Sequence, residues 1–332
     1  MPDATRPELT GEVPITTLSI DSVDYRIGDL VELFVVALAG FAAAMVDGAL
    51  GMGFGPTSSS ILLSTGLSPA AVSTTVNLAK VATGLAAGVA HWRFDNIDRR
   101  LVLQLALPGM VGAAIGVTVL ASVDGNDLKP VLAVLLLLVG VRILFRFSRA
   151  LPRAAAPSEG ASIRSFDDRG ITLAATAGGV TNGLVGAWGP VVTPFLLHRG
   201  LAPRYAIGSV NTAEVAVATV AAGSLVASLG GEGVDFGVVA AMLGGGVLAA
   251  PLAALVVRRI PARALGLAVA ALLLATNLRE LAGWAGLDSG RWALYALVPI
   301  VVVTAAYRPR LARRRRRHAQ ARTEVAASTA AR

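Results

Sequence analysis

The sequence GALGMGFGPTSSS, residues 48–60, interrupts what would otherwise be a long membrane helix. The run before it, LVELFVVALAGFAAAMV at residues 30–46, is strongly apolar, and a short apolar run follows at residues 61–63. Four glycines, one proline and four hydroxyl side chains stand in these thirteen residues. Because glycine and proline disfavour a continuous helix, the stretch predicts a break in the backbone inside the membrane.

The composition of the chain also indicates a membrane protein. Of its 332 residues, 55% are hydrophobic and only 15% are charged, whereas soluble domains carry about 25% charged residues. Several apolar runs approach the length of about 20 residues that spans a bilayer as a helix. The sequence therefore predicts an all-α, polytopic helical bundle with about eight to ten membrane segments.

The net charge of +8 is unevenly distributed. Residues 308–322, RPRLARRRRRHAQAR, carry much of the positive charge, whereas the first 29 residues contain six acidic side chains and two arginines. Because basic segments stay on the cytoplasmic side, we expect a multi-pass protein of the cytoplasmic membrane with its N-terminus outside, its C-terminus inside and no nucleic-acid partner. The arginine run could also bind anionic membrane lipid, or could serve only to hold this orientation.

The chain contains no cysteine and only three histidines, which are far apart in the sequence. Disulfides and thiolate ligands are therefore excluded, and we expect no metal and no other cofactor. A phosphate-binding loop of the GxxxxGK[ST] type is also missing, so direct use of ATP is not expected.

A second copy of the interrupted segment lies 134 residues further along the chain. Residues 55–81, GPTSSSILLSTGLSPAAVSTTVNLAKV, match residues 189–215, GPVVTPFLLHRGLAPRYAIGSVNTAEV, at 11 of 27 positions. The matches include Gly, Pro and Asn in the same order, which chance matching of apolar residues rarely gives. The sequence therefore predicts an internal repeat, and each copy contains an apolar segment too short to cross alone, at residues 57–64 and 191–198.

The charges of the loops predict how the two copies are oriented. Basic loops, expected on the cytoplasmic side, lie at residues 91–100, 146–153 and 258–263. Acidic loops, expected outside, lie at residues 122–127 and 229–235. These assignments agree only if each broken or re-entrant helix pair, at residues 30–64 and 170–198, enters and leaves the membrane on one side. The two repeats are then inverted copies.

The predicted organisation has five parts. An acidic N-terminal tail, residues 1–29, precedes the first transmembrane repeat, residues 30–146. A cytoplasmic linker, residues 147–169, leads to the second repeat with an extra C-terminal helix, residues 170–306, and an Arg-rich cytoplasmic tail, residues 307–332, follows. Inverted repeats joined by broken helices are typical of secondary transporters, whose substrate site lies near the midplane between the repeats. Irregular backbone at that depth persists only where protein or a water-filled cavity satisfies it.

Each break presents groups that suit a small anion. After Pro56 a helix begins again, and its free N–H groups attract anions, with hydroxyls and glycines beside them. The second break, NGLVGAWGPVVT at residues 182–193, repeats this design. Glycines and small hydroxyl residues also let membrane helices pack closely, so a packing role stays open. The candidate substrate-binding residues of the two breaks are Gly51, Gly53, Gly55, Thr57, Ser58, Ser59, Asn182, Gly186, Gly189 and Thr193.

The helix after each break carries polar residues at its centre. Asn77 and Lys80 are three residues apart and share a face, and their repeat equivalents are Asn211 and Glu214. An ionisable group inside a membrane is by default a functional hypothesis. Lys80 could neutralise an anion or pair with Glu214, and Glu214 could carry a coupling proton because burial favours a neutral carboxyl group. We expect Asn77 and Asn211 to line the substrate site. The alternatives are a purely structural ion pair and, for the two asparagines, interhelical hydrogen bonds.

Residues 48–98 resemble the signature half of the sulfite exporter TauE/SafE family of membrane permeases. The resemblance rests on the Gly-rich break, the Pro-led short segment, the turn GLSPAAV and the loop FDNID, and residues 178–220 match the duplication seen in that family. It implies transport of sulfur oxyanions or small organosulfonates. Two features depart from the family pattern, namely the hydroxyl-rich TSSS and the charge of Lys80.

Together these features predict a secondary transporter, an exporter, of a small anion such as sulfite or an organosulfonate. Coupling to protons or to the membrane potential is the simplest expectation. An intramembrane enzyme built on Ser58 or Ser59 with His91, and a membrane scaffold without transport, are the alternatives, and we expect no enzymatic activity. Small-residue faces serve internal and external packing alike, so the sequence predicts no oligomeric state.

Overall fold

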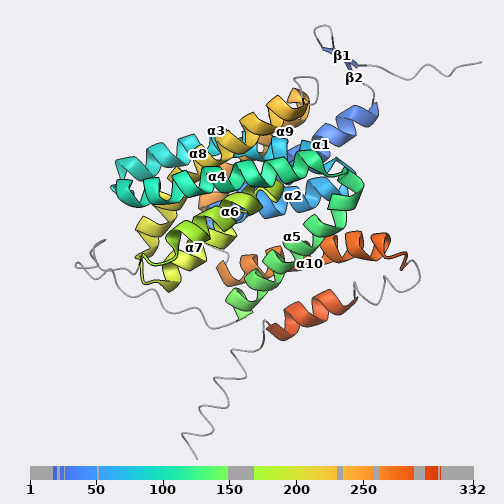
Figure 1. Ribbon diagram of the computed structural model, residues 1–332. Helices are drawn as coiled ribbons and strands as arrows, with labels where there is room; N and C mark the ends of the chain where they lie inside the picture. Colours follow the sequence, from blue (N-terminus) through green and yellow to red (C-terminus); the bar gives the residue numbers. More distant parts are fainter. Residues whose placement is uncertain are drawn as a thin grey trace, which may run out of the picture.

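The computed structural model is a bundle of long helices that also contains short ones (Figure 1). It describes residues 18–20, 23–25, 27–50, 52–148, 168–229, 235–256, 262–287, 296–305 and 307. Gly51 lies outside these residues, as do most of the predicted linker and nearly all of the Arg-rich tail.

The helices follow one another in the order that the repeat predicts. The first half contains α1 (Ile27–Leu50), α2 (Phe54–Ser64), α3 (Pro69–Arg93), α4 (Arg99–Ser122) and α5 (Gly125–Ser148). The second half contains α6 (Ile171–Val185), α7 (Gly189–His198), α8 (Pro203–Leu229), α9 (Phe236–Val256) and α10 (Ala262–Trp284). A further helix covers Ala296–Ala305.

The predicted all-α membrane fold is confirmed, with one small addition. Within the segment expected as an acidic tail, β1 (Leu18–Ile20) and β2 (Val23–Tyr25) pair as a short antiparallel hairpin. The sequence pattern gave no sign of this hairpin, because each strand has only three residues.

Several helices are long and apolar enough to cross a membrane. In the described part of the chain these are Asp29–Asp47, Arg99–Ser122, Gly125–Ser148, Pro203–Ser228 and Arg263–Trp284, and shorter apolar helices cover Ile171–Val185, Phe236–Ala249 and Ala296–Ala305. With 25 residues, α3 also has the length of a span. Its sequence is less apolar because it buries a run of polar side chains that includes Ser73, Asn77 and Lys80.

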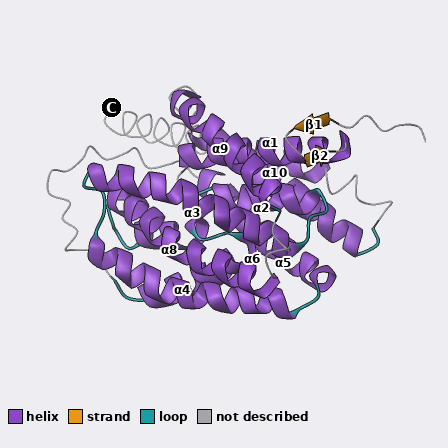
Figure 2. Ribbon diagram, turned by 90° about the horizontal axis from the view of Figure 1, so that it is seen from above, coloured by secondary structure: helices purple, strands orange, loops and turns teal. Residues whose placement is uncertain are grey.

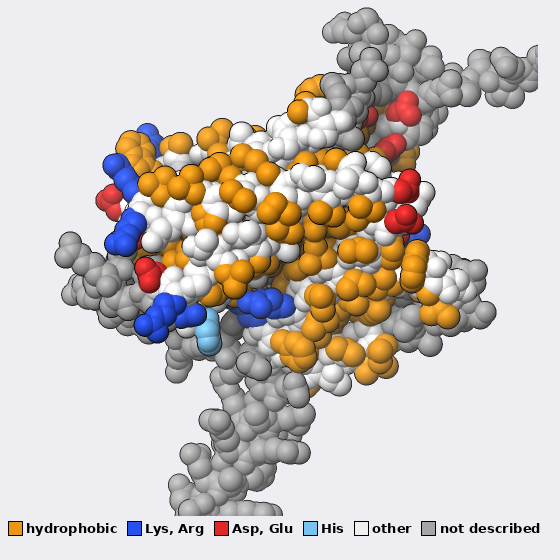
Figure 3. Space-filling model, in the orientation of Figure 1, with side chains coloured by type: hydrophobic (Ala, Val, Ile, Leu, Met, Phe, Trp, Pro, Cys, Tyr) orange, Lys and Arg blue, Asp and Glu red, His pale blue; other side chains and the backbone are white. Residues whose placement is uncertain are grey.

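The surface has the pattern of a protein embedded in lipid (Figure 3). On the face shown, hydrophobic side chains form a broad band. Most of the visible Lys, Arg and His side chains lie toward the end where α3 meets α4 and where α7 ends. Acidic side chains are visible at both ends, and more of them lie at the opposite end, where α4 meets α5. This separation of charge is the one that the loop sequences predict for the two sides of a membrane.

The helices pair between the two halves rather than within them. The most extensive contacts join α1 to α9, α4 to α6, α5 to α10 and α3 to α8. Figure 2 shows α3 and α8 in the middle, with α9 and α1 on one side and α4 on the other. Exchanging the halves maps the α1–α9 pair onto the α6–α4 pair and maps the two other pairs onto themselves. This is the pairing that a twofold-related duplication gives, and the inverted relation in the membrane stays a prediction.

Glycines let the paired helices touch through their backbones. A Cβ atom on Gly112 of α4 would collide with the carbonyl oxygen of Thr176 in α6, and one on Gly245 of α9 with that of Ala37 in α1. Close packing over small residues is the main source of helix association in lipid. The two pairs are therefore tightly packed, and they flank the centre of the molecule.

The two short helices end in matching turns. Gly66 after α2 and Gly200 after α7 have φ values of +99° and +90°, which glycine adopts readily because it lacks a Cβ atom. Pro69 and Pro203 then begin the next helices, in the first turn that suits proline. These turns return the chain to the helices that carry Lys80 and Glu214.

Candidate functional site

The two breaks meet backbone to backbone. A Cβ atom on Gly55 would collide with the carbonyl oxygen of Gly186, and one on Gly189 would lie 3.1 Å from the Cα atom of Met52. Gly53 is also tightly enclosed, here by Val46. The glycines of both breaks are thus needed for close approach, which is the packing role that the sequence left open for them.

The break between α6 and α7 begins with a tight helix end. Gly186 has a φ of +66°, its N–H donates to the carbonyl of Asn182 at 2.8 Å, and the N–H of Ala187 donates to that of Thr181 at 3.2 Å. The bond from Gly186 is that of an αL helix cap, in which the N–H group of the left-handed residue donates to the carbonyl four residues earlier. Other carbonyls of the last turn of α6 still need donors from elsewhere.

Side chains of α2 and α3 supply those donors. The Ser59 hydroxyl donates to the carbonyl of Val185 at 2.8 Å, and the Ser73 hydroxyl to that of Gly183 at 2.6 Å. The end of one half-helix is therefore held by the helices of the other repeat. In this state these hydroxyl groups serve the backbone of the protein.

Asn77 and Asn182 form a reciprocal pair across the same contact. The amide of Asn182 donates to Asn77 Oδ1 at 2.7 Å, and the amide of Asn77 donates to the carbonyls of Ser73 and Asn182 at 2.9 and 3.3 Å. Both side chains are fully buried. This arrangement is the interhelical hydrogen bonding that the sequence left open as the alternative role of Asn77. The binding of substrate by Asn77 stays a prediction.

Lys80 is the hub of the site. Its ammonium group donates to Asn182 Oδ1 and to the carbonyl oxygen of Gly186, both at 2.7 Å, and forms an ion pair with the carboxylate of Glu214. Only 5% of the Lys80 side chain is exposed, against 19% for Glu214. A lysine ammonium has three N–H donors, so these partners occupy all of them. The charge also lies at the C-terminal end of α6, where the helix dipole favours a cation.

Asp47 caps the start of α2, the first short helix. Its Oδ1 atom accepts from the backbone N–H groups of Gly53 and Phe54 at 2.9 and 3.2 Å. A carboxylate at this position satisfies two donors at the start of α2 and is favoured by the helix dipole. Some of the backbone N–H groups that we expected to bind an anion therefore donate to a carboxylate of the protein itself.

A small cavity lies between the breaks. Its volume is about 10 Å³, and its lining comprises Asp47, Met52, Phe54, Gly55, Pro56, Lys80, Gly186, Gly189, Pro190 and Glu214. Such a space holds about one water molecule and is too small for an oxyanion. We call this arrangement, in which the two breaks pack against each other, the closed state.

Two buried hydroxyl groups beside the breaks have no hydrogen-bond partner in the described part of the chain. They belong to Thr57 in the first turn of α2 and Thr193 in α7, and both side chains are fully buried. Buried polar groups are nearly always paired, and an unpaired one calls for a physical explanation. A ligand oxygen that reaches the start of either short helix would supply the missing partner.

Some predicted residues do not join this network. The Ser58 hydroxyl donates to carbonyls of its own helix, Phe54 at 2.6 Å and Gly55 at 3.0 Å. Asn211 is half-buried and makes none of the hydrogen bonds found around Lys80. Among the described contacts, His91 pairs with neither Ser58 nor Ser59. Gly51 lies outside the described residues.

The sequence reasoning missed several participants. Ser73 stands one helical turn before Asn77, so its position on the same face of α3 was readable from the spacing. Met52, in the lining of the cavity, had no chemical signal of its own. A separate polar cluster joins α2 to α10: Ser60 bonds Thr276 at 2.7 Å and accepts from Asn277 at 2.6 Å. The members from α10 lie some 217 residues from Ser60, so only the fold reveals the cluster.

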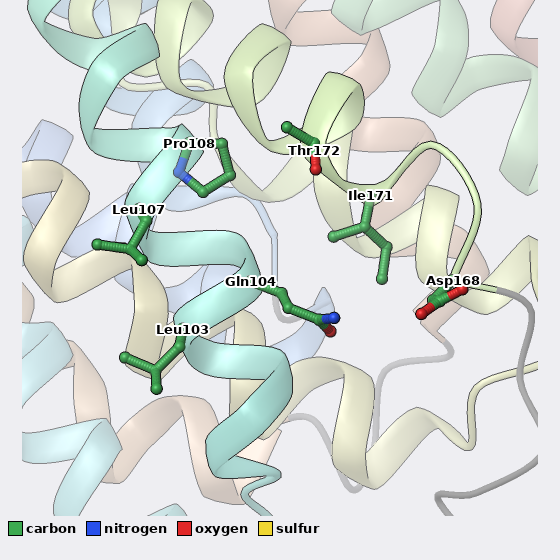
Figure 4. A pocket seen from close by; sticks show the side chains of 7 residues that line it. All are labelled: Leu103, Gln104, Leu107, Pro108, Asp168, Ile171 and Thr172. Atoms are coloured by element: carbon green, nitrogen blue, oxygen red, sulfur yellow. The ribbon is translucent and has the colours of Figure 1, made fainter.

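A wider groove lies elsewhere, on the flank of the α4–α6 pair (Figure 4). Its volume is about 320 Å³, and it is lined by Leu103, Gln104, Leu107 and Pro108 of α4 and by Asp168, Ile171 and Thr172 at the start of α6. None of the predicted site residues lines it. We therefore place the candidate site in the small cavity, where the buried charges are.

Comparison with known proteins places the chain in a family of membrane transporters. The family model described as sulfite exporter TauE/SafE matches residues 36–279, a range that includes both breaks. The chain is also similar to the probable membrane transporter protein YtnM of Bacillus subtilis (strain 168), with 38% identity over 255 residues, covering 75% of this chain and 83% of the relative. No solved structure matches the chain.

Proposed function

The chain belongs to the sulfite exporter TauE/SafE family of membrane transporters, and from this premise we propose that it exports a small anion. The substrate class is a sulfur oxyanion such as sulfite, or an organosulfonate. It binds in the cavity between the two breaks when that cavity opens, and the pairs α1–α9 and α4–α6 are the rigid bodies between which the path opens. The protein works in the cytoplasmic membrane with its N-terminus outside.

The observation that carries this proposal is the environment of Lys80. A buried ammonium group is costly in a membrane, and Lys80 stands where both breaks meet. All its donors are held by protein acceptors in the closed state. An oxyanion offers the same kind of acceptor, so substrate binding can replace the carboxylate of Glu214 at the ammonium group.

The charges around the cavity support coupling to a proton. Asp47, Lys80 and Glu214 sum to one net negative charge when all are ionised. Adding an anion next to two carboxylates is unfavourable, by about 4 kcal/mol for each pair of charges 4 Å apart at an effective dielectric constant of about 20. If Glu214 takes up a proton when it leaves Lys80, the anion meets a free cation instead. One proton then accompanies each anion.

This coupling lowers the electrical driving force for a doubly charged oxyanion, but the remaining force still favours export. A doubly charged oxyanion that moves with one proton carries one net negative charge. An inside-negative membrane potential favours its outward movement by about 2.3 kcal/mol per 100 mV. The potential alone can therefore drive the anion out.

The test is transport by the purified protein in proteoliposomes. We expect saturable uptake of radiolabelled sulfite, thiosulfate or methanesulfonate by the wild type, and a loss of at least tenfold with Lys80→Ala. Lys129→Ala, which removes the other lysine of the chain, is the matched control. If folded wild-type protein takes up none of the three anions, the proposed function is refuted.

Proton coupling needs a second readout in the same vesicles. A trapped pH-sensitive dye should report acidification inside the vesicles as the anion enters with wild-type protein. With Glu214→Gln, which cannot exchange a proton, any remaining anion flux should leave the internal pH unchanged. Equal acidification per anion in both proteins would rule out Glu214 as the carrier.

A further inference from the structure

Arg146 lies in the last turn of α5 and contacts Met52 of the first break. Its side chain is half-buried, and its Nη1 atom lies 3.7 Å from the Sδ atom of Met52. The guanidinium carbon is also 5.8 Å from the ring centre of Phe147. A thioether is only a weak acceptor, so most of the five N–H donors of the arginine have no strong partner in the part of the chain that the structure describes.

Charge makes this position more unusual. Arg142 lies one turn earlier on the same face of α5 and is exposed, and no acidic side chain pairs with either arginine among the described residues. Like charges four residues apart destabilise a helix. An arginine near a membrane surface ordinarily extends its head group into water, whereas Arg146 folds inward onto Met52. Two unneutralised guanidinium groups at one place present the fork geometry that binds oxyanions well.

Met52 connects this position to the central cavity. It lines the cavity together with Lys80, and its Cα atom lies next to Gly189 of the other break. Its side chain therefore separates Arg146 on one side from the cavity on the other. Methionine has three rotatable side-chain bonds and adapts its shape readily, so this separation can open without movement of a helix.

From these contacts we propose that Arg146, assisted by Arg142, forms an outer binding site for the oxyanion, which then passes Met52 to reach Lys80. This inference rests on the proposed function. The site faces the cytoplasm, because α5 ends in the basic segment at residues 146–153. Its role is to raise the local concentration of the anion at the entrance of the path, so its loss weakens apparent affinity more than maximal rate.

The experiment measures radiolabelled sulfite uptake into inside-out membrane vesicles, in which the cytoplasmic face is outward. We compare wild type with Arg146→Gln, Arg146→Lys and Arg142→Gln, and with Arg100→Gln, an exposed arginine on the α3–α4 side that has no contact with the breaks. Size-exclusion profiles in detergent establish that each variant is folded. Right-side-out vesicles from the same cells give the rate from the opposite face.

The expected result is a rise of about tenfold in the half-saturating sulfite concentration for Arg146→Gln, the effect of losing one charge-assisted hydrogen bond. Its maximal rate should change by less than about twofold. Arg146→Lys keeps the charge and loses the fork. This variant and Arg142→Gln should each raise the half-saturating sulfite concentration by about threefold. The wild-type value should also rise with added salt, because salt screens exposed charges, and this rise should be smaller in Arg146→Gln.

The outcomes separate the two proposals. Suppose that the wild type transports sulfite and that Arg146→Gln either leaves the half-saturating concentration unchanged or changes it no more than Arg100→Gln does. Either result overturns the outer site and leaves the proposed transport function intact. Absence of wild-type flux overturns both. If Arg146→Gln does not fold, the test uses Arg142→Gln and Arg146→Lys instead. The outer site is then overturned if both variants have the half-saturating sulfite concentration of the wild type.

Discussion

The two breaks have the same sequence plan and different chemistry. At the break between α1 and α2, a carboxylate from α1 caps the start of the short helix. At the break between α6 and α7, the C-terminal end of α6 is held by hydroxyl, amide and ammonium donors from the other repeat. The first break is thus satisfied from within its own repeat, and the second depends on the first repeat for its donors.

The surroundings of the short helices differ as well. α2 packs on α1, α3 and α10, and its Ser60 joins the polar cluster with Thr276 and Asn277. The strongest contacts of α7 are with α6 and α8, its neighbours in sequence. The duplicated sequence pattern therefore predicts where the two breaks occur. The packing around each short helix determines how firmly that helix is held. We infer that α2 is the fixed wall of the site and α7 the wall that yields.

The largest effect should come from Lys80→Ala, which removes the donor that holds the second break. The change leaves the carboxylate of Glu214 and the carbonyl of Gly186 without their partner. Breaking a buried ion pair costs about 3–5 kcal/mol. We expect a correspondingly large fall in the thermal unfolding temperature in detergent, followed through the fluorescence of the buried Trp188.

Two further variants sharpen this prediction. Lys129→Ala should leave the unfolding temperature nearly unchanged. Replacing both partners, as in Lys80→Met with Glu214→Leu, should recover much of the stability, because the uncompensated charge is gone. If Lys80→Ala is no less stable than Lys129→Ala, the second break does not depend on this donor, and the contrast between the breaks fails.

A smaller effect is expected where the breaks touch. Gly55→Ala places a Cβ atom against the carbonyl oxygen of Gly186, and the neighbouring backbone has to move. Overpacking of this kind costs about 1–3 kcal/mol. Gly223→Ala in α8 is the matched control, since a Cβ atom there meets nothing within 4 Å, and it should stabilise the helix by about 0.5–1 kcal/mol. Equal unfolding temperatures for the two variants would contradict the contact between the breaks.

Much of this architecture was readable from the sequence because membranes impose simple rules. Apolar length and composition predicted the all-α membrane fold, and the shared Gly, Pro and Asn positions at residues 55–81 and 189–215 predicted where both short helices and their turns lie. The spacing of Asn77 and Lys80 placed both on one face of α3. The ion pair between Lys80 and Glu214 was one of the two alternatives that the sequence left open, and it is present.

The remainder needed the fold. No pattern in the chain indicates that the carbonyls at the end of α6 draw their donors from α2 and α3, because that pairing depends on how the halves pack. The same holds for Arg146 and Met52, which are 94 residues apart. The hydroxyls of the first break looked alike in the sequence, yet Ser58 and Ser59 bond to carbonyls, while Thr57 has no partner among the described residues.

The smallest effect offers the most direct comparison of the two short helices. Thr57→Val and Thr193→Val remove hydroxyl groups that have no partner in the described part of the chain, at nearly constant side-chain volume. Removing a buried polar group that lacks a hydrogen bond should leave stability unchanged or raise it by about 1 kcal/mol. If these hydroxyls bind the substrate, anion flux in proteoliposomes should nevertheless fall, by about five- to tenfold for each lost hydrogen bond. Lower stability together with normal flux would show that the hydroxyls serve the fold. A fall confined to Thr193→Val would assign the binding of substrate to α7, the wall that yields, and would make α2 the support against which it closes.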